Sequence, residues 1–202
     1  QGHRWNKQDF WGTISLFSGG HTNMNNNKPS VVVSGGGLWT PEHSISNEEL
    51  VGAYNAYAVK YNAEHASEIE SGELAEKPQS SAEFVAKASG IHSRFAYCKD
   101  GILDVDRMRP RIPVRGDDEL SHQAEMALKA ARIALKEANK DPSEIDAVIV
   151  SCAYTQRSYP AIAIEVQNEL GIKGFGFDML VACSAATFAL QRAYEMVSAG
   201  TA

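Results

Sequence analysis

The stretch that decides the fold is 175–190, which reads FGFDMLVACSAATFAL. Its first part, 175–181, is an apolar run typical of a buried strand. The alanine-rich residues from Ser184 to about Ser198 predict a helix that ends at Gly200. Cys183 therefore lies at a strand-to-helix turn, where free backbone N–H groups and the positive end of a helix dipole favour thiolate over thiol. We interpret Cys183 as a candidate nucleophile.

The cysteines and histidines of the chain also allow other interpretations. Cys183 could be a small buried core residue, as most free cysteines are, but its position at the turn favours the nucleophile. Cys152 ends another predicted strand and is interpreted as core, while Cys98 lies in a predicted loop and is given no role. The six histidines form no H-x-x-x-H or Cys/His set, so we predict no metal site and identify no histidine as a base.

Helical and strand patterns alternate before Cys183. Apolar residues recur at spacings of three and four over 118–139, which predicts a helix, and 145–152 is an apolar run typical of a buried parallel strand. A second helix is predicted from Pro160 to Gly171. This order predicts an α/β fold with right-handed crossovers and helices on both faces of the sheet. The helix after Cys183 carries so little charge that we expect it to lie between two sheets.

The amino-terminal part is less regular. Ser30–Ser34 (SVVVS) predicts a strand that enters a tight turn at Gly35–Gly37. A phosphate-binding loop is rejected there, because no Gly-Lys-Ser/Thr follows. A helix capped by Asn47 is predicted to run from Glu48 toward Tyr61.

Two irregular stretches flank a further short helix, which is predicted from Ala82 to Ala88. The polar and uneven residues 64–81 predict a surface insertion, and 98–116, with four arginines and two prolines, predicts a long ordered loop. One interpretation of the arginines Arg107, Arg109, Arg111 and Arg115 is a basic patch that docks an acidic carrier protein. The other, which we favour, is a solvated loop.

Composition excludes several classes of protein. The chain has 202 residues, is 44% hydrophobic and carries a formal net charge of −6, which suits a globular domain and gives no support for nucleic-acid binding. Three cysteines without paired spacing and the lack of a cleavable signal favour a reducing compartment, so we expect a cytoplasmic protein. No apolar stretch approaches the roughly 20 residues that span a bilayer.

Residues 1–23 mix aromatic, glycine and polar residues without a clear period. Met24, followed by three asparagines and Lys28, is typical of a natural start. We therefore expect residues 1–23 to be a non-native or disordered extension, and 24–202 to form one half-domain.

Several segments in 145–200 resemble β-ketoacyl-acyl carrier protein synthase III, of the thiolase-like superfamily. They are DAVIVSCA (146–153), Ser158-Tyr159-Pro160-Ala161, IEVQNELGIKG (164–174), 175–190 and AYEMVSAG (193–200). A weaker resemblance extends upstream through the helix after Asp118, the Ser89-Gly90-Ile91 turn with Arg94, and the opening strand with Pro41. The resemblance implies the amino-terminal half of a layered αβαβα sandwich with a mixed, mostly parallel sheet.

The resemblance also implies an activity. Cys183 would take an acyl group from acyl-coenzyme A or acyl-acyl carrier protein and yield it to the carbanion formed by decarboxylation of malonyl-acyl carrier protein, which initiates fatty-acid synthesis. No cofactor is implied, and the full-length protein is expected to be a homodimer. The family's catalytic His and Asn belong to the carboxy-terminal half, so we expect this chain to be a fragment that is inactive alone.

Three further residues are candidates for substrate binding through the resemblance. Phe84 and Ala88 stand where many family members have a Trp and an Arg that hold coenzyme A, so the usual adenine clamp is altered, and Arg94 follows the same turn. Tyr159 stands where the family places an aromatic that reaches across a dimer interface into the partner's acyl pocket. A plain packing role for Tyr159 is the alternative.

Other functions remain open from the sequence. Within enzymes they are another thiolase-like member, such as a hydroxymethylglutaryl-coenzyme A synthase or a polyketide starter synthase. From another class, a non-catalytic acyl-carrier-binding subunit is an alternative. A cysteine hydrolase is disfavoured because no base partner is identified.

Overall fold

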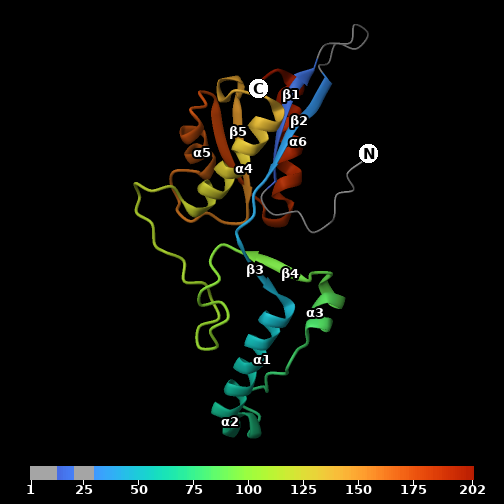
Figure 1. Ribbon diagram of the computed structural model, residues 1–202, viewed down its shortest axis with the longest axis vertical. Coiled ribbons are helices and arrows are strands. Elements are labelled where there is room, and N and C mark those ends of the chain that lie inside the picture. Colours follow the sequence, from blue (N-terminus) through green and yellow to red (C-terminus); the bar gives the residue numbers. More distant parts are fainter. Residues whose placement is uncertain (1–12, 21–29) are drawn as a thin grey trace. The chain divides into compact units, whose positions relative to one another are not determined.

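The computed structural model describes residues 13–20 and 30–202, and the chain divides into two compact units (Figure 1). The first unit holds the described residues up to Thr40 together with Arg115–Ala202. The second unit is Pro41–Val114.

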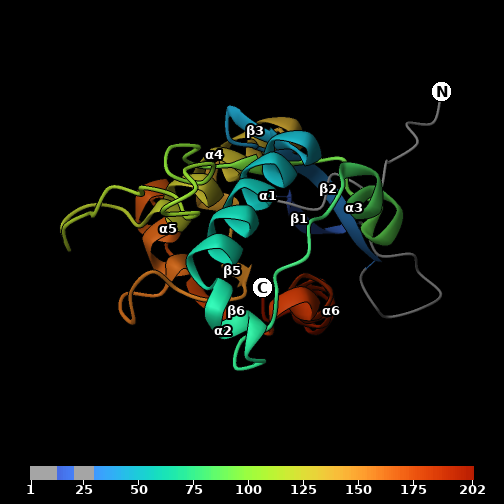
Figure 2. The ribbon, with the colours of Figure 1, turned by 90° about the horizontal axis from the view of Figure 1, so that it is seen from below.

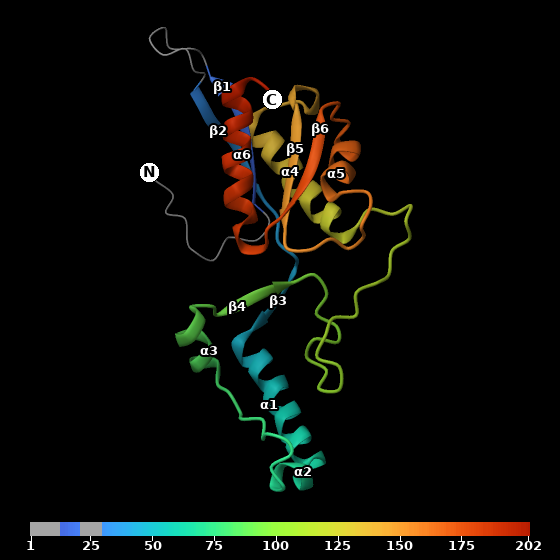
Figure 3. The same cartoon turned by 180° about the vertical axis from the view of Figure 1, so that it is seen from behind.

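The first unit carries helices on both faces of a parallel strand pair. Strands β5 (Ala147–Cys152) and β6 (Phe175–Leu180) are parallel and in register from Ala147 opposite Phe175 to Cys152 opposite Leu180. Figure 1 shows helices α4 (His122–Ala138) and α5 (Ile162–Leu170) on one face of this pair, and Figure 3 shows α6 (Ala185–Ala199) on the other. The predicted α/β arrangement is confirmed.

The predicted helix ends are more accurate than the predicted starts. Gly171 and Gly200 end α5 and α6 in the left-handed conformation, with φ of 72° and 67°, as the sequence predicts. Helix α4 begins four residues later than expected, because the Ser121 hydroxyl caps it by accepting from Ala124 N at 3.1 Å. Helix α5 begins at Ile162 instead of Pro160.

The predicted turn at Gly35–Gly37 is wrong, because these glycines lie inside strand β2 (Ser30–Leu38). A Cβ at Gly37 would meet Ala130 O at 2.1 Å, and one at Gly35 would meet Ala138 N at 2.7 Å. Gly36 N donates a hydrogen bond to Glu137 Oε2 at 2.6 Å. The glycines therefore let the strand backbone pack directly against the backbone of α4.

Strand β1 (Thr13–Gly20) pairs with β2 in antiparallel fashion, with an irregularity in register between Leu16 and Phe17. It lies within the segment 1–23, which the sequence indicates to be an extension. Part of that segment is thus a strand paired with β2. That residues 1–23 are a non-native extension stays a prediction. Residues 1–12 and 21–23 lie outside the described part of the chain.

The core of the first unit lies between α4, α5 and the parallel strands. Ala124, Ile162 and Val166 are buried together, and partly buried apolar side chains including Val148 and Cys152 pack against them. Helix α6 is different, because large apolar side chains remain exposed on it: Phe188, Leu190 and Tyr194 are 49%, 46% and 56% exposed. The described residues leave these three side chains of α6 partly uncovered, and the expected second sheet stays a prediction.

The second unit is built around the long helix α1 (Asn47–Glu64), seen from below in Figure 2. Ser46, not the predicted Asn47, caps α1, because Ser46 and Glu49 form a reciprocal capping box. Strands β3 (His43–Ser46) and β4 (Ser93–Ala96) pair in antiparallel fashion. Helix α3 (Ala82–Ser89) ends at Gly90 with φ 71°, close to its predicted bounds.

The predicted insertion 64–81 contains helix α2 (Ala66–Glu70) and then returns along α1. Two asparagines of α1 bind the returning backbone with both ends of their amides. Asn62 Nδ2 donates to Lys77 O at 2.9 Å and Asn62 Oδ1 accepts from Lys77 N at 2.9 Å. Asn55 does the same with Ser80, at 3.0 and 2.9 Å. The insertion is therefore an ordered strap on α1.

Candidate active site

Cys183 lies in a short 3₁₀ helix, Ala182–Ser184, that joins β6 to α6. The side chain is exposed, and Ser184 N donates to Val181 O at 3.1 Å to close the turn. Ala182 has φ 45°, a left-handed conformation that costs a non-glycine residue on the order of 1 kcal/mol. Strained backbone of this kind is concentrated at functional sites.

The start of α6 presents its positive dipole end to Cys183. Ser184, the residue before α6, makes no capping hydrogen bond with its side chain. Ser151 Oγ of β5 donates to Ala185 O at 3.1 Å, which ties the first turn of α6 to the neighbouring strand. The N–H groups of a helix start stabilise negative charge beside them, so the turn has the geometry to stabilise an oxyanion formed next to Cys183.

The other two thiols have different surroundings. Cys152 is half-buried at the end of β5, and burial, followed by the nearby charge of Asp178, raises the pKa of its thiol. A raised pKa keeps this thiol protonated and poorly nucleophilic. Cys98 belongs to the second unit, and its Sγ donates to Arg111 O at 3.4 Å. Cys183 is thus the exposed member of the three.

Tyr159 lies on the loop 153–161 between β5 and α5. The loop follows the carboxyl end of β5, and Cys183 follows the carboxyl end of β6. Because the two strands are parallel, the loop and Cys183 begin at the same end of the strand pair. In open α/β sheets, ligands bind outside the carboxyl ends of the strands. The Tyr159 side chain is 87% exposed, so it is not packed into its own unit.

A carboxylate of β6 caps α5. Asp178 Oδ2 accepts from Ile162 N, and Asp178 Oδ1 from Ala163 N, both at 2.8 Å. The residue before α5, Ala161, has no side chain that could do this. Asp178 is the charged residue within the apolar run 175–181, and this contrast is a sequence signal for a special role. The sequence does not show which backbone groups Asp178 binds.

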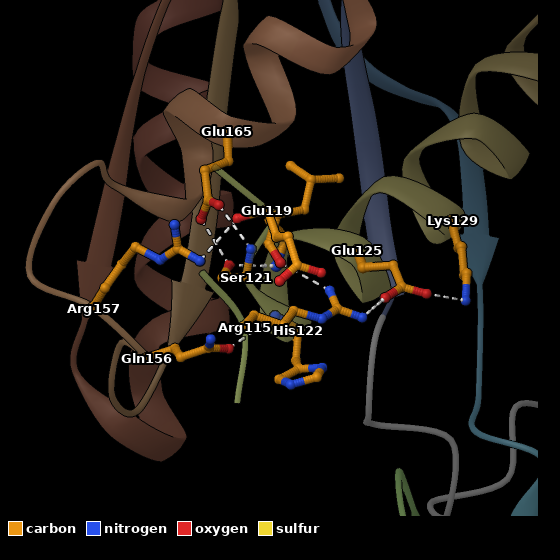
Figure 4. Close-up of polar contacts among 11 residues, drawn as sticks. Arg115, Glu119, Ser121, His122, Glu125, Lys129, Gln156, Arg157 and Glu165 are labelled. Carbon is orange, nitrogen blue, oxygen red and sulfur yellow. Dashed lines mark hydrogen bonds and ion pairs between the residues drawn. The ribbon is translucent and has the colours of Figure 1, made fainter. Parts of the chain in front are cut away.

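A second carboxyl group, that of Glu165, binds Ser121, the residue that caps α4. Glu165 of α5 is only 7% exposed, and it accepts hydrogen bonds from Ser121 N at 2.8 Å and Ser121 Oγ at 2.7 Å (Figure 4). These two bonds give both oxygens of the buried side chain a hydrogen-bond partner. Nothing in the sequence indicates that Ser121 and Glu165 form this pair.

Glu125 lies one turn into α4, between two cations (Figure 4). Lys129 Nζ donates to Glu125 Oε1 at 2.6 Å, and Arg115 Nη2 pairs with Glu125 Oε2. Hydrogen bonds from Lys129 and then Arg115 lower the pKa of the Glu125 carboxyl to about 2. Arg115 also donates to Leu120 O at 2.8 Å, so the pair ties the segment before α4 to its first turns.

We expect Glu125→Gln to lower the free energy of unfolding by about 1 kcal/mol at neutral pH, since the ion pairs are partly exposed and screened. The folded-state pKa lies below the ordinary value of 4.5, so the stabilisation is complete above pH 4.5 and is lost as the pH falls toward about 2. Urea unfolding of both proteins between pH 7 and pH 3 measures the difference. Glu169→Gln, at an exposed position on α5, is the control, and a difference independent of pH contradicts the prediction.

The remaining candidate residues, Phe84 and Arg94, belong to the second unit. Phe84 is 65% exposed on α3. Arg94 Nη2 donates to Asn47 Oδ1 at 2.7 Å and Nη1 to Ser46 O at 3.2 Å, so this guanidinium holds β4 to the start of α1. Roles for Phe84 and Arg94 in substrate binding stay predictions.

The loop 98–114 contains three of the four arginines predicted there, and two of these three, Arg107 and Arg111, bind other residues of the loop. Arg111 pairs with Asp104 at 2.8 Å and Arg107 donates to Arg109 O at 3.1 Å. An open cavity of ≈ 520 Å³ in this loop is lined by Asp104, Asp106, Arg107, Arg109 and Arg111. Acidic and basic side chains thus alternate there, which fits a self-contained polar loop better than a basic docking patch.

Among residues 13–20 and 30–202, no group of three metal-ligating side chains occurs, and no helix is long and apolar enough to cross a bilayer.

Comparison with curated proteins gives strong sequence similarity. Over 150 residues the chain is 51% identical to a β-ketodecanoyl-[acyl-carrier-protein] synthase of Pseudomonas aeruginosa, an alignment that covers 74% of this chain and 43% of the relative. A β-ketoacyl-[acyl-carrier-protein] synthase III of Brucella anthropi is 38% identical over 90 residues, which are 44% of this chain and 27% of the relative. The chain thus spans less than half the length of these relatives. No family model matches.

Solved structures agree on the fold. The 3-oxoacyl-[acyl-carrier-protein] synthase III of Aquifex aeolicus superposes with a TM-score of 0.54 at 23% identity, over 82% of this chain and 40% of that one. The priming β-ketosynthase of the R1128 polyketide pathway gives 0.55 at 25% identity, over 83% and 37%. The thiolase-like fold is therefore confirmed. The chain is thus similar in sequence to β-ketoacyl-[acyl-carrier-protein] synthases and shares the thiolase-like fold of the synthase III type.

Proposed function

We propose that the full-length protein is a condensing acyltransferase that uses Cys183 as its nucleophile. The observation that carries this proposal is the exposed Cys183 thiol at the start of α6, in a chain 51% identical over 150 residues to a β-ketodecanoyl-[acyl-carrier-protein] synthase. Exchange between thioesters is nearly balanced in energy, so a cysteine can both accept and release an acyl group.

The reaction has two steps. In the first, the Cys183 thiolate attacks the carbonyl of an acyl thioester, a new C–S bond forms, and the donor thiolate leaves and takes up a proton. In the second, malonyl-acyl carrier protein loses CO₂, and the carbanion attacks the acyl carbon on Cys183. The carbon–carbon bond forms as the Cys183 thiolate leaves. Backbone N–H groups at the start of α6 would stabilise the oxyanion in both steps.

The acyl donor is proposed to carry a medium-length chain. The most similar relative described above is named for a β-ketodecanoyl product, which has ten carbons. Decarboxylative condensation with a malonyl group adds two carbons, so such a product arises from an acyl group of about eight carbons. We propose the same preference here, with acyl-coenzyme A or acyl-acyl carrier protein as donor, in a cytoplasmic homodimer that initiates fatty-acid synthesis.

The test is to map the site of acylation by mass spectrometry. The full-length protein is incubated with acyl-coenzyme A and acyl-acyl carrier protein thioesters of different lengths. We expect the acyl mass on Cys183, gained fastest from the eight-carbon donors. Acylation of Cys98 or Cys152 instead contradicts the mechanism, and no acylation with any donor favours a non-catalytic, acyl-carrier-binding role.

A further inference from the structure

Ser151, near the end of β5, is linked by a hydrogen bond to the helix that begins beside Cys183. Its Oγ donates to Ala185 O at 3.1 Å. The strand residues on either side of it, Val150 and Cys152, pack into the core against α4 and α5. Successive residues of a strand point to opposite faces, so Ser151 faces α6, on the other side of the strand pair (Figure 3). Among the residues that the structure describes, no other side chain from outside 181–188 hydrogen-bonds this stretch.

The turn around Cys183 has few hydrogen bonds of its own. Ser184 N donates to Val181 O at 3.1 Å, and Ala185 N donates to Ala182 O. The Ser184 side chain makes no capping hydrogen bond to α6. Ala182 is in the left-handed conformation, with φ 45°, which is strained for a residue with a side chain and persists only where the surrounding structure holds it.

The bond from Ala185 N fixes the direction of the Cys183 N–H. The carbonyl of Ala182 and the N–H of Cys183 belong to one planar, trans peptide unit, in which they point in opposite directions. Ala185 N holds that carbonyl, and Ser151 in turn holds Ala185 O. Ala185 is itself 1% exposed, so packing keeps the residue that joins the two bonds in place. Two consecutive hydrogen bonds thus lead from β5 to the peptide unit of the nucleophile.

A second bond of the same kind runs from β6 to α5. Asp178 accepts from the first N–H groups of α5. In the parallel register Asp178 lies opposite Val150, and Ser151 lies opposite Met179, the next pair along the strands. Each strand therefore holds the helix that follows the other strand. The geometry of the turn at the start of α6 is thus set by the strand pair and not by α6 alone.

We propose that Ser151 is a positioning residue that, through Ala185, holds the Cys183 N–H toward the oxyanion formed during acyl transfer. The inference rests on the proposed acylation of Cys183. A backbone N–H stabilises an oxyanion only when it is aimed at the place where the charge develops, and a small displacement lowers the rate strongly. Ser151 itself bonds to the backbone and not to the sulfur. Its loss should therefore slow acyl transfer without slowing reactions of Cys183 that form no oxyanion.

The test compares Ser151→Thr with Ser151→Val in the full-length protein, because the two side chains have nearly the same shape and only threonine keeps the hydroxyl. We measure the rate of Cys183 acylation by octanoyl-coenzyme A. For Ser151→Val the maximal rate should fall roughly tenfold, with the half-saturating donor concentration within about twofold, as expected for an interaction made in the transition state. Ser151→Thr should keep at least about half of the parent rate. Ser44→Ala, at an exposed serine of β3, is the control and should match the parent.

A second readout separates positioning of the N–H from a general effect on the turn. Iodoacetamide reacts with the Cys183 thiolate at a saturated carbon and forms no oxyanion, so the alkylation rate should stay within about twofold in every variant. Circular dichroism and thermal unfolding establish that the variants are folded. If Ser151→Val does not fold, Ser151→Ala removes the hydroxyl without added bulk and takes its place.

Three outcomes decide against a proposal. An acylation rate within about twofold of the parent after loss of the hydroxyl overturns the inference. A parallel fall in acylation and alkylation also overturns it, because the hydroxyl would then support the whole turn and not the oxyanion donor. Absence of Cys183 acylation in the parent protein overturns the proposed function instead.

Discussion

Replacing Cys183 with alanine is expected to abolish acylation of the full-length protein and to lower its rate of condensation by at least about 10⁴-fold. The reason is that both proposed steps pass through one sulfur atom. The other described thiols are poorer candidates, since Cys152 is half-buried with a raised pKa and the Cys98 thiol donates a hydrogen bond to Arg111 O. Cys183→Ser should be almost as damaging, because a hydroxyl is a far weaker nucleophile than a thiolate.

The measurement is the initial rate of condensation together with the acyl mass on the intact protein. Cys98→Ala is the matched control and should keep most of the parent rate. Circular dichroism and thermal unfolding establish that each variant is folded. Residual acylation of Cys183→Ala above about a tenth of the parent value would show that the nucleophile lies elsewhere.

Cys183 and its surroundings show which parts of the site the sequence reveals. The cysteine was predictable because an apolar strand, a small turn and an alanine-rich helix follow one another without a gap. The contacts that hold the elements around it were not, because they join residues far apart in the chain: Ser151 and Ala185 are separated by 34 positions, and Ser121 and Glu165 by 44. Ala182 carries no sequence signal for φ 45°, since glycine is the usual residue there.

The fold shows the same division between local and tertiary causes. Helix ends at Gly171 and Gly200 and the strand before Cys183 follow from local chemistry, and the structure confirms them. The error at Gly35–Gly37 has a tertiary cause, because a glycine run reads as a turn unless the helix that packs on it is known. The cap of α1 was misplaced by one residue, since Ser46 and Asn47 are both good caps and the Glu49 side chain decides between them.

The glycine run leads to the largest expected effect on stability. Gly37→Ala should lower the free energy of unfolding by at least about 3 kcal/mol. The new methyl group would lie 2.1 Å from Ala130 O and 2.6 Å from Ala134 N, and these atoms belong to the backbone of α4, which cannot move aside as a flexible side chain can. Strand β2 and α4 would have to separate, and packing lost along their whole contact is not recovered elsewhere.

The neighbouring glycine supplies a control with the same chemistry. A Cβ at Gly36 meets only Glu137 Oε2, at 3.7 Å, an ordinary contact with the end of a flexible side chain. Gly36→Ala should therefore change stability by less than about 1 kcal/mol, since alanine also restricts the unfolded chain. Urea unfolding of both variants in the full-length protein decides the matter. Equal effects at the two positions would mean that β2 does not pack on α4 as the structure has it, and that the run is the tight turn its sequence indicates.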